Sequence, residues 1–310
     1  MAPVAAITTS APGSLMLLGE HAVLHGHRAL VGAINQRIMV ALIPLSADTV
    51  EIHSALGEYK APLDALIDHP SFRFVLHAVE RHRAVVSGGF RLDIESDFSA
   101  DIGFGSSAAV TVATHAALMA WTRGEAPAAE AVFQAALDTV QSVQGRGSGA
   151  DLAASVFGGI VAYTIAPTFD SVEIAVPLTA VYSGYKTPTP EVIAKVEAAR
   201  AEDPERFASL YEEVDVSVAD AVEKLRQHDL PGFGQILNRN HELMRQMGVE
   251  TPELERIVAK LQAEPDVFGA KISGSGLGDC AVGMGYTPLE GLDFPTYHLE
   301  ISPAGVLYDD

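Results

Sequence analysis

The chain has 310 residues, of which 48% are hydrophobic and 19% charged, a composition typical of globular proteins and not of disordered ones. This length is enough for one large domain or two ordinary ones. Forty acidic residues stand against 20 basic ones, so the formal net charge is −20. Such a charge disfavours nucleic acids and anionic membranes as partners. It still permits an anionic substrate, because a local cluster of donors can bind phosphate.

Cysteine content and the N-terminus indicate the cellular compartment. The single cysteine, Cys280, cannot form a disulfide within the chain, which suits a reducing environment. Residues 1–6 lack the basic region of a signal peptide. The most apolar long stretch, residues 108–121, contains His115 and is shorter than the roughly 20 residues of a membrane helix. We therefore expect a cytoplasmic protein without a membrane-spanning segment.

The first half of the sequence mixes predicted strands and helices. Strands are expected at residues 4–10, 29–43, 49–53, 90–94, 160–165 and 172–181. Helices are expected at residues 64–82, 106–122 and 127–143. Pro70 should interrupt the first of these, and Pro127 should lie in the first turn of the third. A further short helix after Asp151 should end at Gly158.

The second half begins as a helical region and returns to strands. Residues 190–263 are predicted to be helical, with breaks near Asp203-Pro204, Leu230-Pro231 and Gly248. Strands are expected at residues 267–272, 280–283 and 298–301. This order indicates a mixed α+β fold and not a strict βαβ alternation. Gly184 and Pro188 interrupt the pattern, so we predict one domain over residues 1–183 and another over 184–310.

A glycine-rich loop, DIGFGSSAA at residues 101–109, leads directly into a predicted helix. Gly103 and Gly105 allow close approach of the backbone to a ligand. The next backbone N–H groups begin a helix, where unpaired donors and the helix dipole favour an anion. The hydroxyls of Ser106 and Ser107 could reach a phosphate or Mg²⁺, although the pattern also fits a capped turn without a ligand. No lysine follows the second glycine, so this is not a Walker loop.

This loop resembles the G-x-G-S-S-A-A phosphate motif of the GHMP kinases, which include galactokinases and homoserine, mevalonate and phosphomevalonate kinases. Residues 11–23, APGSLMLLGEHAV, are similar to the first motif of that family, and residues 271–280, KISGSGLGDC, resemble the third. The three segments follow one another in the family's order and spacing. The resemblance implies an ATP site formed by Gly103, Gly105, Ser106, Ser107, Ala108, Gly274, Ser275 and Gly276.

The resemblance also implies a fold and a reaction. Its N-terminal α+β domain would be like domain 2 of ribosomal protein S5, its C-terminal domain would be ferredoxin-like, and the active site would lie between them. The reaction would transfer the γ-phosphate of ATP to an alcohol with the help of Mg²⁺. Residues 19–23 and 238–254 are most similar to mevalonate kinases, so mevalonate is the expected acceptor. Homodimers are common among such relatives.

An acidic residue follows a second glycine-rich segment, QGRGSGAD at residues 144–151. Asp151 at the start of a helix could simply stabilise the turn. By resemblance it corresponds to the aspartate that orients and deprotonates the substrate hydroxyl in mevalonate and phosphomevalonate kinases. The resemblance implies substrate contacts from Ser14, Glu20, His21 and Ser148, and a Mg²⁺ contact from Ser107. His21 and His241 also fit the interpretation of packed, hydrogen-bonded structural histidines.

The sequence departs from this family in its positive charge. Mevalonate kinases usually carry A-P-G-K in the first motif, whereas Ser14 stands at the lysine position here. Phosphoryl transfer depends on charge neutralisation, so the missing lysine matters unless another cation replaces it. Lys186, Arg146 and Lys271 are candidates, although each could be an ordinary surface or structural base.

A second departure concerns the metal ligand. Mevalonate kinases usually place a Mg²⁺-binding glutamate on the helix before the catalytic aspartate, and Val140 occupies the matching position here. Asp138 lies roughly 200° around that helix, so it is a poor replacement. The segment before Asp151 is closer to phosphomevalonate kinases.

These departures leave several alternatives. The acceptor could be a phosphomevalonate-like compound or a different hydroxyl of mevalonate, as in a mevalonate 3-kinase, or the enzyme could be an ATP-dependent decarboxylase. A nucleotide-binding protein with little turnover is a further alternative, against which Asp151 and the phosphate loop argue.

Overall fold

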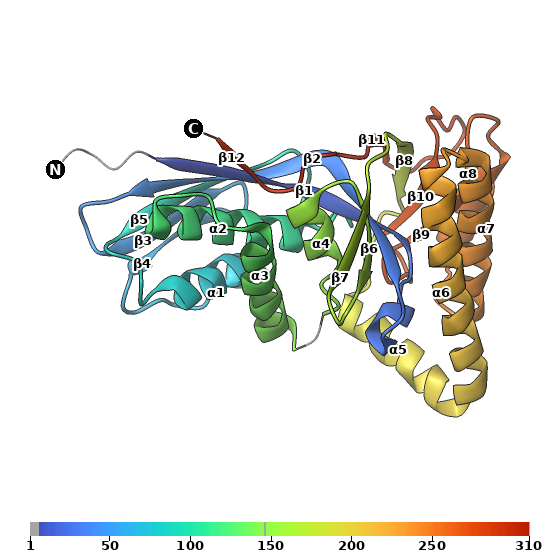
Figure 1. Cartoon of the computed structure of the whole chain (residues 1–310), viewed down its shortest axis with the longest axis horizontal. Helices are drawn as coiled ribbons and strands as arrows, with labels where there is room; N and C mark the ends of the chain where they lie inside the picture. The colour runs from blue at the N-terminus through green and yellow to red at the C-terminus, as the bar shows by residue number, and fades with distance from the viewer. Residues whose placement is uncertain (1–5, 146, 310) are drawn as a thin grey trace.

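The computed structural model describes residues 6–145 and 147–309, which form two β-sheets with helices packed on them (Figure 1). The eight strands of the first sheet are β1 (Ile7–Leu18), β2 (Ala29–Pro44), β3 (Thr49–Ser54), β4 (Gly57–Pro62), β5 (Phe90–Ser96), β6 (Ile160–Thr164), β7 (Thr168–Val172) and β12 (Leu307–Asp309). Their order is β12-β1-β2-β5-β3-β4, with β6 paired to β2 and β7 to β6. Strands β3 and β5 are parallel, and the other neighbours are antiparallel.

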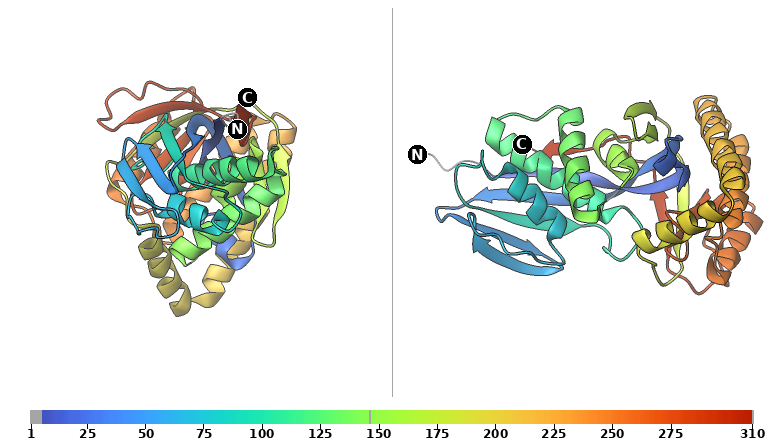
Figure 2. Two further views of the ribbon diagram at one scale, coloured as in Figure 1. Left: turned by 90° about the vertical axis from the view of Figure 1, so that its left-hand side faces the viewer. Right: turned by 90° about the horizontal axis from the view of Figure 1, so that it is seen from below.

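The helices of the first half are η1 (Ala22–His25), α1 (Arg73–His82), α2 (Ser106–Arg123), α3 (Ala129–Gln144) and α4 (Ala150–Phe157). Helices α2 and α4 pack on β1 and β2, and α1 and α3 pack against α2 (Figure 2). Helix α2 is therefore covered on most sides. Its many alanines suit this position, because small side chains allow the sheet and the neighbouring helices to approach it closely.

The second sheet has four strands in the order β11-β8-β10-β9 and contacts a group of long helices. The strands are β8 (Pro177–Tyr182), β9 (Ala270–Ser273), β10 (Cys280–Met284) and β11 (Thr296–Glu300), and the helices are α5 (Thr189–Glu202), α6 (Pro204–Arg226), α7 (Leu230–Gln246) and α8 (Pro252–Ala263). Helices α7 and α8 pack on this sheet, and α6 packs on α7. The α+β prediction is confirmed.

The predicted breaks between the long helices are also confirmed, and capping explains them. Asp203, Asp229 and Thr251 each accept a backbone hydrogen bond at a helix N-terminus. A proline follows within the first turn in each case, where its missing N–H has no intrahelical partner to lose.

Several predicted boundaries are wrong. Residues 64–72 form turns and irregular structure, and α1 begins only at Arg73. Pro70 disfavours a helical conformation at the residue before it, so residues 64–69 do not join this helix. Pro127 lies before the N-cap of α3 and not in its first turn. The predicted strand at 172–181 contains the end of β7 and most of β8, which belong to different sheets. Strands β4 and β12 were not predicted.

Strand β1 continues beyond the predicted residue 10 and carries most of the first glycine motif. Its pairing with β2 shifts between Pro12 and Ser14, and at this irregularity the Ser14 N–H donates to the Phe104 carbonyl at 3.0 Å. A Cβ on Gly13 would lie 2.5 Å from that carbonyl oxygen, so only glycine permits the contact. The first motif thus holds the loop 101–105 against the sheet.

The two halves of the molecule share strands and a core. Leu15 and Leu17 on β1 pack in one buried cluster with Phe233 on α7 and Val282 on β10. Strand β8 precedes residue 184 yet lies in the second sheet, while β12 returns to the first. The division at 183/184 therefore stays a prediction. Among residues 6–145 and 147–309, no helix combines the length and apolar character needed to cross a bilayer.

Candidate active site

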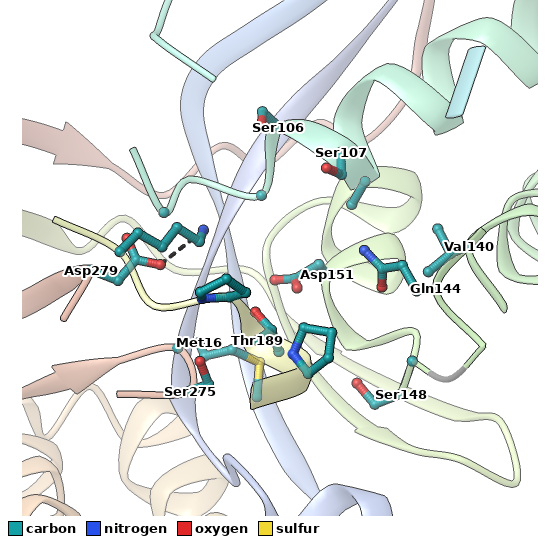
Figure 3. Close-up of a pocket in the computed structure, with 18 of the residues that line it drawn as sticks. Met16, Ser106, Ser107, Val140, Gln144, Ser148, Asp151, Thr189, Ser275 and Asp279 are labelled. Atoms are coloured by element: carbon teal, nitrogen blue, oxygen red, sulfur yellow. Dashed lines mark ion pairs between the residues drawn. The ribbon is translucent and has the colours of Figure 1, made fainter. Parts of the chain in front are cut away.

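A cavity of about 1040 Å³ lies where the three glycine-rich segments meet (Figure 3). Most of the predicted site residues line it: Glu20, His21, Gly103, Gly105, Ser106, Ser107, Ala108, Ser148, Asp151, Gly274 and Ser275. Two predicted residues are not part of its lining. Ser14 is 1% exposed and lies behind Asp151, and Gly276 packs against Val249. The fold therefore gathers segments that are more than 250 residues apart in the chain around one space.

The phosphate loop ends at the first turn of α2. Gly105 is the N-cap and adopts φ 67°, a left-handed conformation that glycine reaches without strain. No side chain caps this helix start. Ser106 and Ser107 stand at the edge of the cavity (Figure 3). The first N–H groups of α2 are consequently available to an anionic ligand.

Asp151 lies in the first turn of α4 and faces the same cavity (Figure 3). The Ser14 hydroxyl donates to its Oδ1 at 2.8 Å, which orients the carboxyl group. Burial raises the pKa of Asp151, and the nearby Asp279 carboxylate adds to this. The Ser14 hydrogen bond and the Lys186 charge act in the opposite direction without cancelling the rise. The result is a carboxylate more basic than an ordinary aspartate, held at the wall of a cavity.

Asp279, for which the sequence predicted no role, belongs to the third glycine-rich segment (residues 271–280) and lies against the phosphate loop. Its Oδ2 is 2.9 Å from Lys186 Nζ, the ion pair drawn in Figure 3. A Cβ on Gly103 would lie 2.1 Å from Asp279 Oδ1, so the two loops touch there. An acidic residue within an otherwise glycine-rich loop was a signal that could have identified it.

The remaining candidate cations have different surroundings. Lys271 is 0% exposed and forms a buried ion pair with Glu20, which is 3% exposed as a side chain. Its Nζ also donates to the Ile272 carbonyl. Burial lowers the pKa of Lys271 and raises that of Glu20. Arg146 lies outside the described residues. Of the two described candidates, only Lys186 lines the cavity.

The two histidines singled out from the sequence differ in position. His21 lines the cavity, and its Nε2 donates to the Ser275 carbonyl at 2.9 Å, which joins the first motif to the third. Burial lowers the pKa of His241 to about 4, and this ring lies 3.1 Å from Glu250. His241 is not part of the cavity lining. Cys280 is fully buried, and burial raises the pKa of its thiol, so it is not a nucleophile.

Comparison with known protein families identifies relatives of the chain. A model of the GHMP kinases N terminal domain matches residues 72–159, and one of the GHMP kinases C terminal matches residues 221–288. The mevalonate kinase of Archaeoglobus fulgidus is 35% identical over 276 residues, which cover 89% of this chain and 91% of that protein. The chain belongs to the GHMP kinase family. Its members transfer a phosphoryl group from ATP, here to an alcohol, and the predicted two-domain architecture is confirmed.

Two further relatives and one sequence signature define the similarity. The mevalonate kinase of Aeropyrum pernix is 28% identical over 90% of this chain and 88% of that protein. The structure of the L. major mevalonate kinase in complex with R-mevalonate superimposes with a TM-score of 0.80 at 23% identity, covering 98% and 99% of the two chains. At that identity, the likeness demonstrates the fold alone. A galactokinase galactose-binding signature also matches residues 2–44.

At the position on α3 where mevalonate kinases usually carry a metal-binding glutamate, this GHMP kinase has Val140. Val140 lines the cavity, whereas Asp138 points elsewhere, forming an ion pair with Arg81 and accepting a hydrogen bond from Gln134 at 2.8 Å. Within the described part of the chain, no group of three or more His, Cys, Asp or Glu side chains is placed to hold a metal ion. Gln144, one turn after Val140, also faces the cavity (Figure 3).

Proposed function

We propose that this kinase phosphorylates mevalonate, with Asp151 as the general base. The observation that carries the proposal is the position of Asp151: a carboxylate of raised pKa in the same cavity as the uncapped start of α2. The mevalonate kinase relatives, which cover about nine tenths of the chain, support mevalonate as the alcohol. Cytoplasmic location and a homodimer remain predictions from the sequence.

The triphosphate of ATP would bind along the first turn of α2. The N–H groups of Ser106, Ser107 and Ala108 belong to the uncapped first turn, and Gly274 and Ser275 line the cavity as part of the third glycine-rich segment. Backbone donors at a helix start bind phosphate oxygens without any lysine in the loop itself. The nucleotide phosphates would then lie in the cavity that also contains the proposed base.

The residues present also fit a magnesium ion held mainly by the nucleotide. Magnesium usually keeps several waters and takes one or two protein oxygens besides phosphate oxygens. Ser107 lines the cavity, and its hydroxyl could provide one such oxygen. When bound, the ion would neutralise phosphate charge.

The proton of the acceptor hydroxyl would pass to Asp151. Its Oδ1 is occupied by the Ser14 O–H, so Oδ2 is the oxygen available to the substrate. Ser14 is then a positioning residue for the base, although the sequence analysis placed it among the substrate contacts. Glu20, His21 and Ser148 remain proposed substrate contacts, because they line the cavity.

Replacement of the base tests this assignment. Asp151→Asn should lower kcat by about 10³-fold, within the range that general bases contribute, and should leave nucleotide affinity nearly unchanged. The measurements are ADP release with mevalonate and ATP binding by calorimetry. Asp138→Asn is the matched control, because Asp138 pairs with Arg81 and does not line the cavity. This variant should retain full activity. Unchanged turnover in Asp151→Asn would exclude Asp151 as the base.

The acceptor needs a separate test, because a galactose-binding signature matches residues 2–44. ADP release should be measured with mevalonate, its mono- and diphosphates, galactose and other sugars. Carbon dioxide should be measured in parallel, since a decarboxylase would release it. Mevalonate should give the highest kcat/KM without carbon dioxide. A preference for a sugar or a phosphorylated acceptor would replace mevalonate in the proposal.

A further inference from the structure

Among the described residues that line the cavity, acidic side chains outnumber basic ones. Glu20, Asp101, Asp151 and Asp279 belong to this lining, although Glu20 is already paired with the buried Lys271, whereas Arg73 and Lys186 are its basic residues. Adding ATP would bring several further negative charges beside Asp151 and Asp279. Phosphoryl transfer in such a site requires a cation near the transferred group.

Burial and position distinguish the two cations. Arg73 is an exposed residue at the start of α1, where its guanidinium lies over the Phe74 ring. Lys186 lies in the segment between β8 and α5 and pairs with Asp279, which touches the phosphate loop at Gly103. Of the two basic residues in the described lining, Lys186 is therefore the one beside the phosphate loop.

The backbone around Lys186 is attached to the third glycine-rich segment. Ser183 N–H donates to the Asp279 carbonyl at 2.8 Å, and Asp279 N–H donates to the Tyr185 carbonyl at 2.7 Å. The Thr187 hydroxyl donates to the Leu277 carbonyl at 2.6 Å. These bonds flank Lys186 on both sides, so the position of its Cα is set by the loop that closes the cavity.

The side chain of Lys186 is also fixed by an ion pair, but it remains accessible to solvent. Its ammonium group pairs with a carboxylate that is only 11% exposed, while the lysine side chain remains 39% exposed. Burial alone would lower the pKa of Lys186, but the charges of Asp279 and Asp151 raise it above the ordinary value. A lysine in this position stays charged and can be reached by a ligand.

We propose that Lys186 binds the transferred phosphate and supplies the positive charge that the first motif lacks at Ser14, and that Asp279 positions it. This inference rests on the proposed function, because it takes the cavity as the triphosphate site. Asp279 acts through Lys186: one carboxylate oxygen holds the ammonium group, and the other lies against the phosphate loop, where no described residue hydrogen-bonds to it.

The decisive experiment compares ATP with ADP. Lys186→Met should weaken ATP binding about tenfold and change ADP affinity less than twofold, because the charge faces the phosphate that only ATP carries. It should also lower kcat on the order of 10²-fold, the size of effect expected for one electrostatic donor to a transition state. Lys186→Arg should restore part of both losses, since it restores the charge.

Matched variants separate this role from a structural one. Lys195→Met removes an exposed lysine of α5 and should behave as the parent protein. Asp279→Asn should reduce kcat less than Lys186→Met, because it loosens the ammonium group without removing it. The melting temperature of every variant is measured, and ATP and ADP titrations are interpreted only for folded protein.

The results distinguish this inference from the proposed function. Nucleotide titrations need no acceptor, so an enzyme that ignores mevalonate can still confirm or refute the role of Lys186. An equal loss of ATP and ADP affinity in folded Lys186→Met would overturn the proposal. So would kcat within twofold of the parent protein.

Discussion

Two lysine–carboxylate pairs stand beside the same cavity, and they differ in what surrounds them. Lys271 and Glu20 have side chains 0% and 3% exposed, whereas Lys186 and Asp279 are 39% and 11% exposed. In the first pair, the ammonium group donates hydrogen bonds to Glu20 and to a backbone carbonyl. In the second, it keeps contact with solvent and the cavity. The same two chemical groups therefore form a buried structural contact in one place, whereas in the other the lysine stays accessible for the proposed binding of phosphate.

Breaking the buried pair should have the largest effect on stability. Lys271→Met leaves the Glu20 carboxylate buried without its partner, and removing one member of such a pair costs about 3–5 kcal/mol. Urea unfolding should detect this as a lower midpoint. The double variant Glu20→Gln with Lys271→Met should recover part of the loss, because no charge remains buried. A single variant as stable as the parent protein would contradict the structural role.

Displacing Asp279 from its position beside Lys186, without removing either charge, should have an intermediate effect on stability. Gly103→Ala would place a Cβ 2.1 Å from Asp279 Oδ1, so the carboxylate or the phosphate loop must shift. Overpacking of this kind costs about 1–3 kcal/mol, and ATP affinity should fall with it. Gly88→Ala is the control, because its Cβ would meet only Asp48 Oδ1 at 3.9 Å. Calorimetric ATP binding and thermal unfolding measure the two effects, and an unchanged Gly103→Ala would show that the contact is loose.

The pH dependence of catalysis should report the coupling between Lys186 and Asp151. A base works only when deprotonated, so kcat/KM should fall as pH drops through the raised pKa of Asp151. The positive charge of Lys186 lowers that pKa, so Lys186→Met should move the acid limb to higher pH. Lys195→Met should leave the acid limb in place. A limb that moves downwards in Lys186→Met would contradict the coupling.

Breaking the partly exposed pair of Lys186 and Asp279 should have the smallest effect on stability. Lys186→Met should change the free energy of unfolding by no more than about 1 kcal/mol, because partly exposed ion pairs are worth little. Thermal unfolding beside Lys271→Met makes the comparison direct. If both lysine variants were equally destabilised, the two pairs would have the same structural role, and the contrast drawn from their burial would be wrong.

Much of the fold could be predicted because its signals are local. The breaks between α5, α6, α7 and α8 depend on capping side chains and prolines within one turn of each helix start. Strand β12 and the separation of β7 from β8 could not be found in the same way. Those strands are defined by partners distant in the chain, such as the pairing of β12 with β1.

For the proposed active site, the glycines and helix start of residues 101–109 suggested an anion site from the sequence by itself, because they are adjacent in the chain. The third glycine-rich segment and Asp151 were predicted by resemblance to the GHMP kinases. Only the tertiary structure decided which lysine is available. No residues adjacent in the sequence distinguish Lys186 from Lys271. In the fold, Lys271 is buried beside Glu20, whereas Lys186 lies at the cavity beside Asp279. The tertiary structure also placed Ser14 behind Asp151. Burial and charge neighbours arise from packing between distant segments, and these decide whether a charged side chain stabilises the fold or meets a ligand.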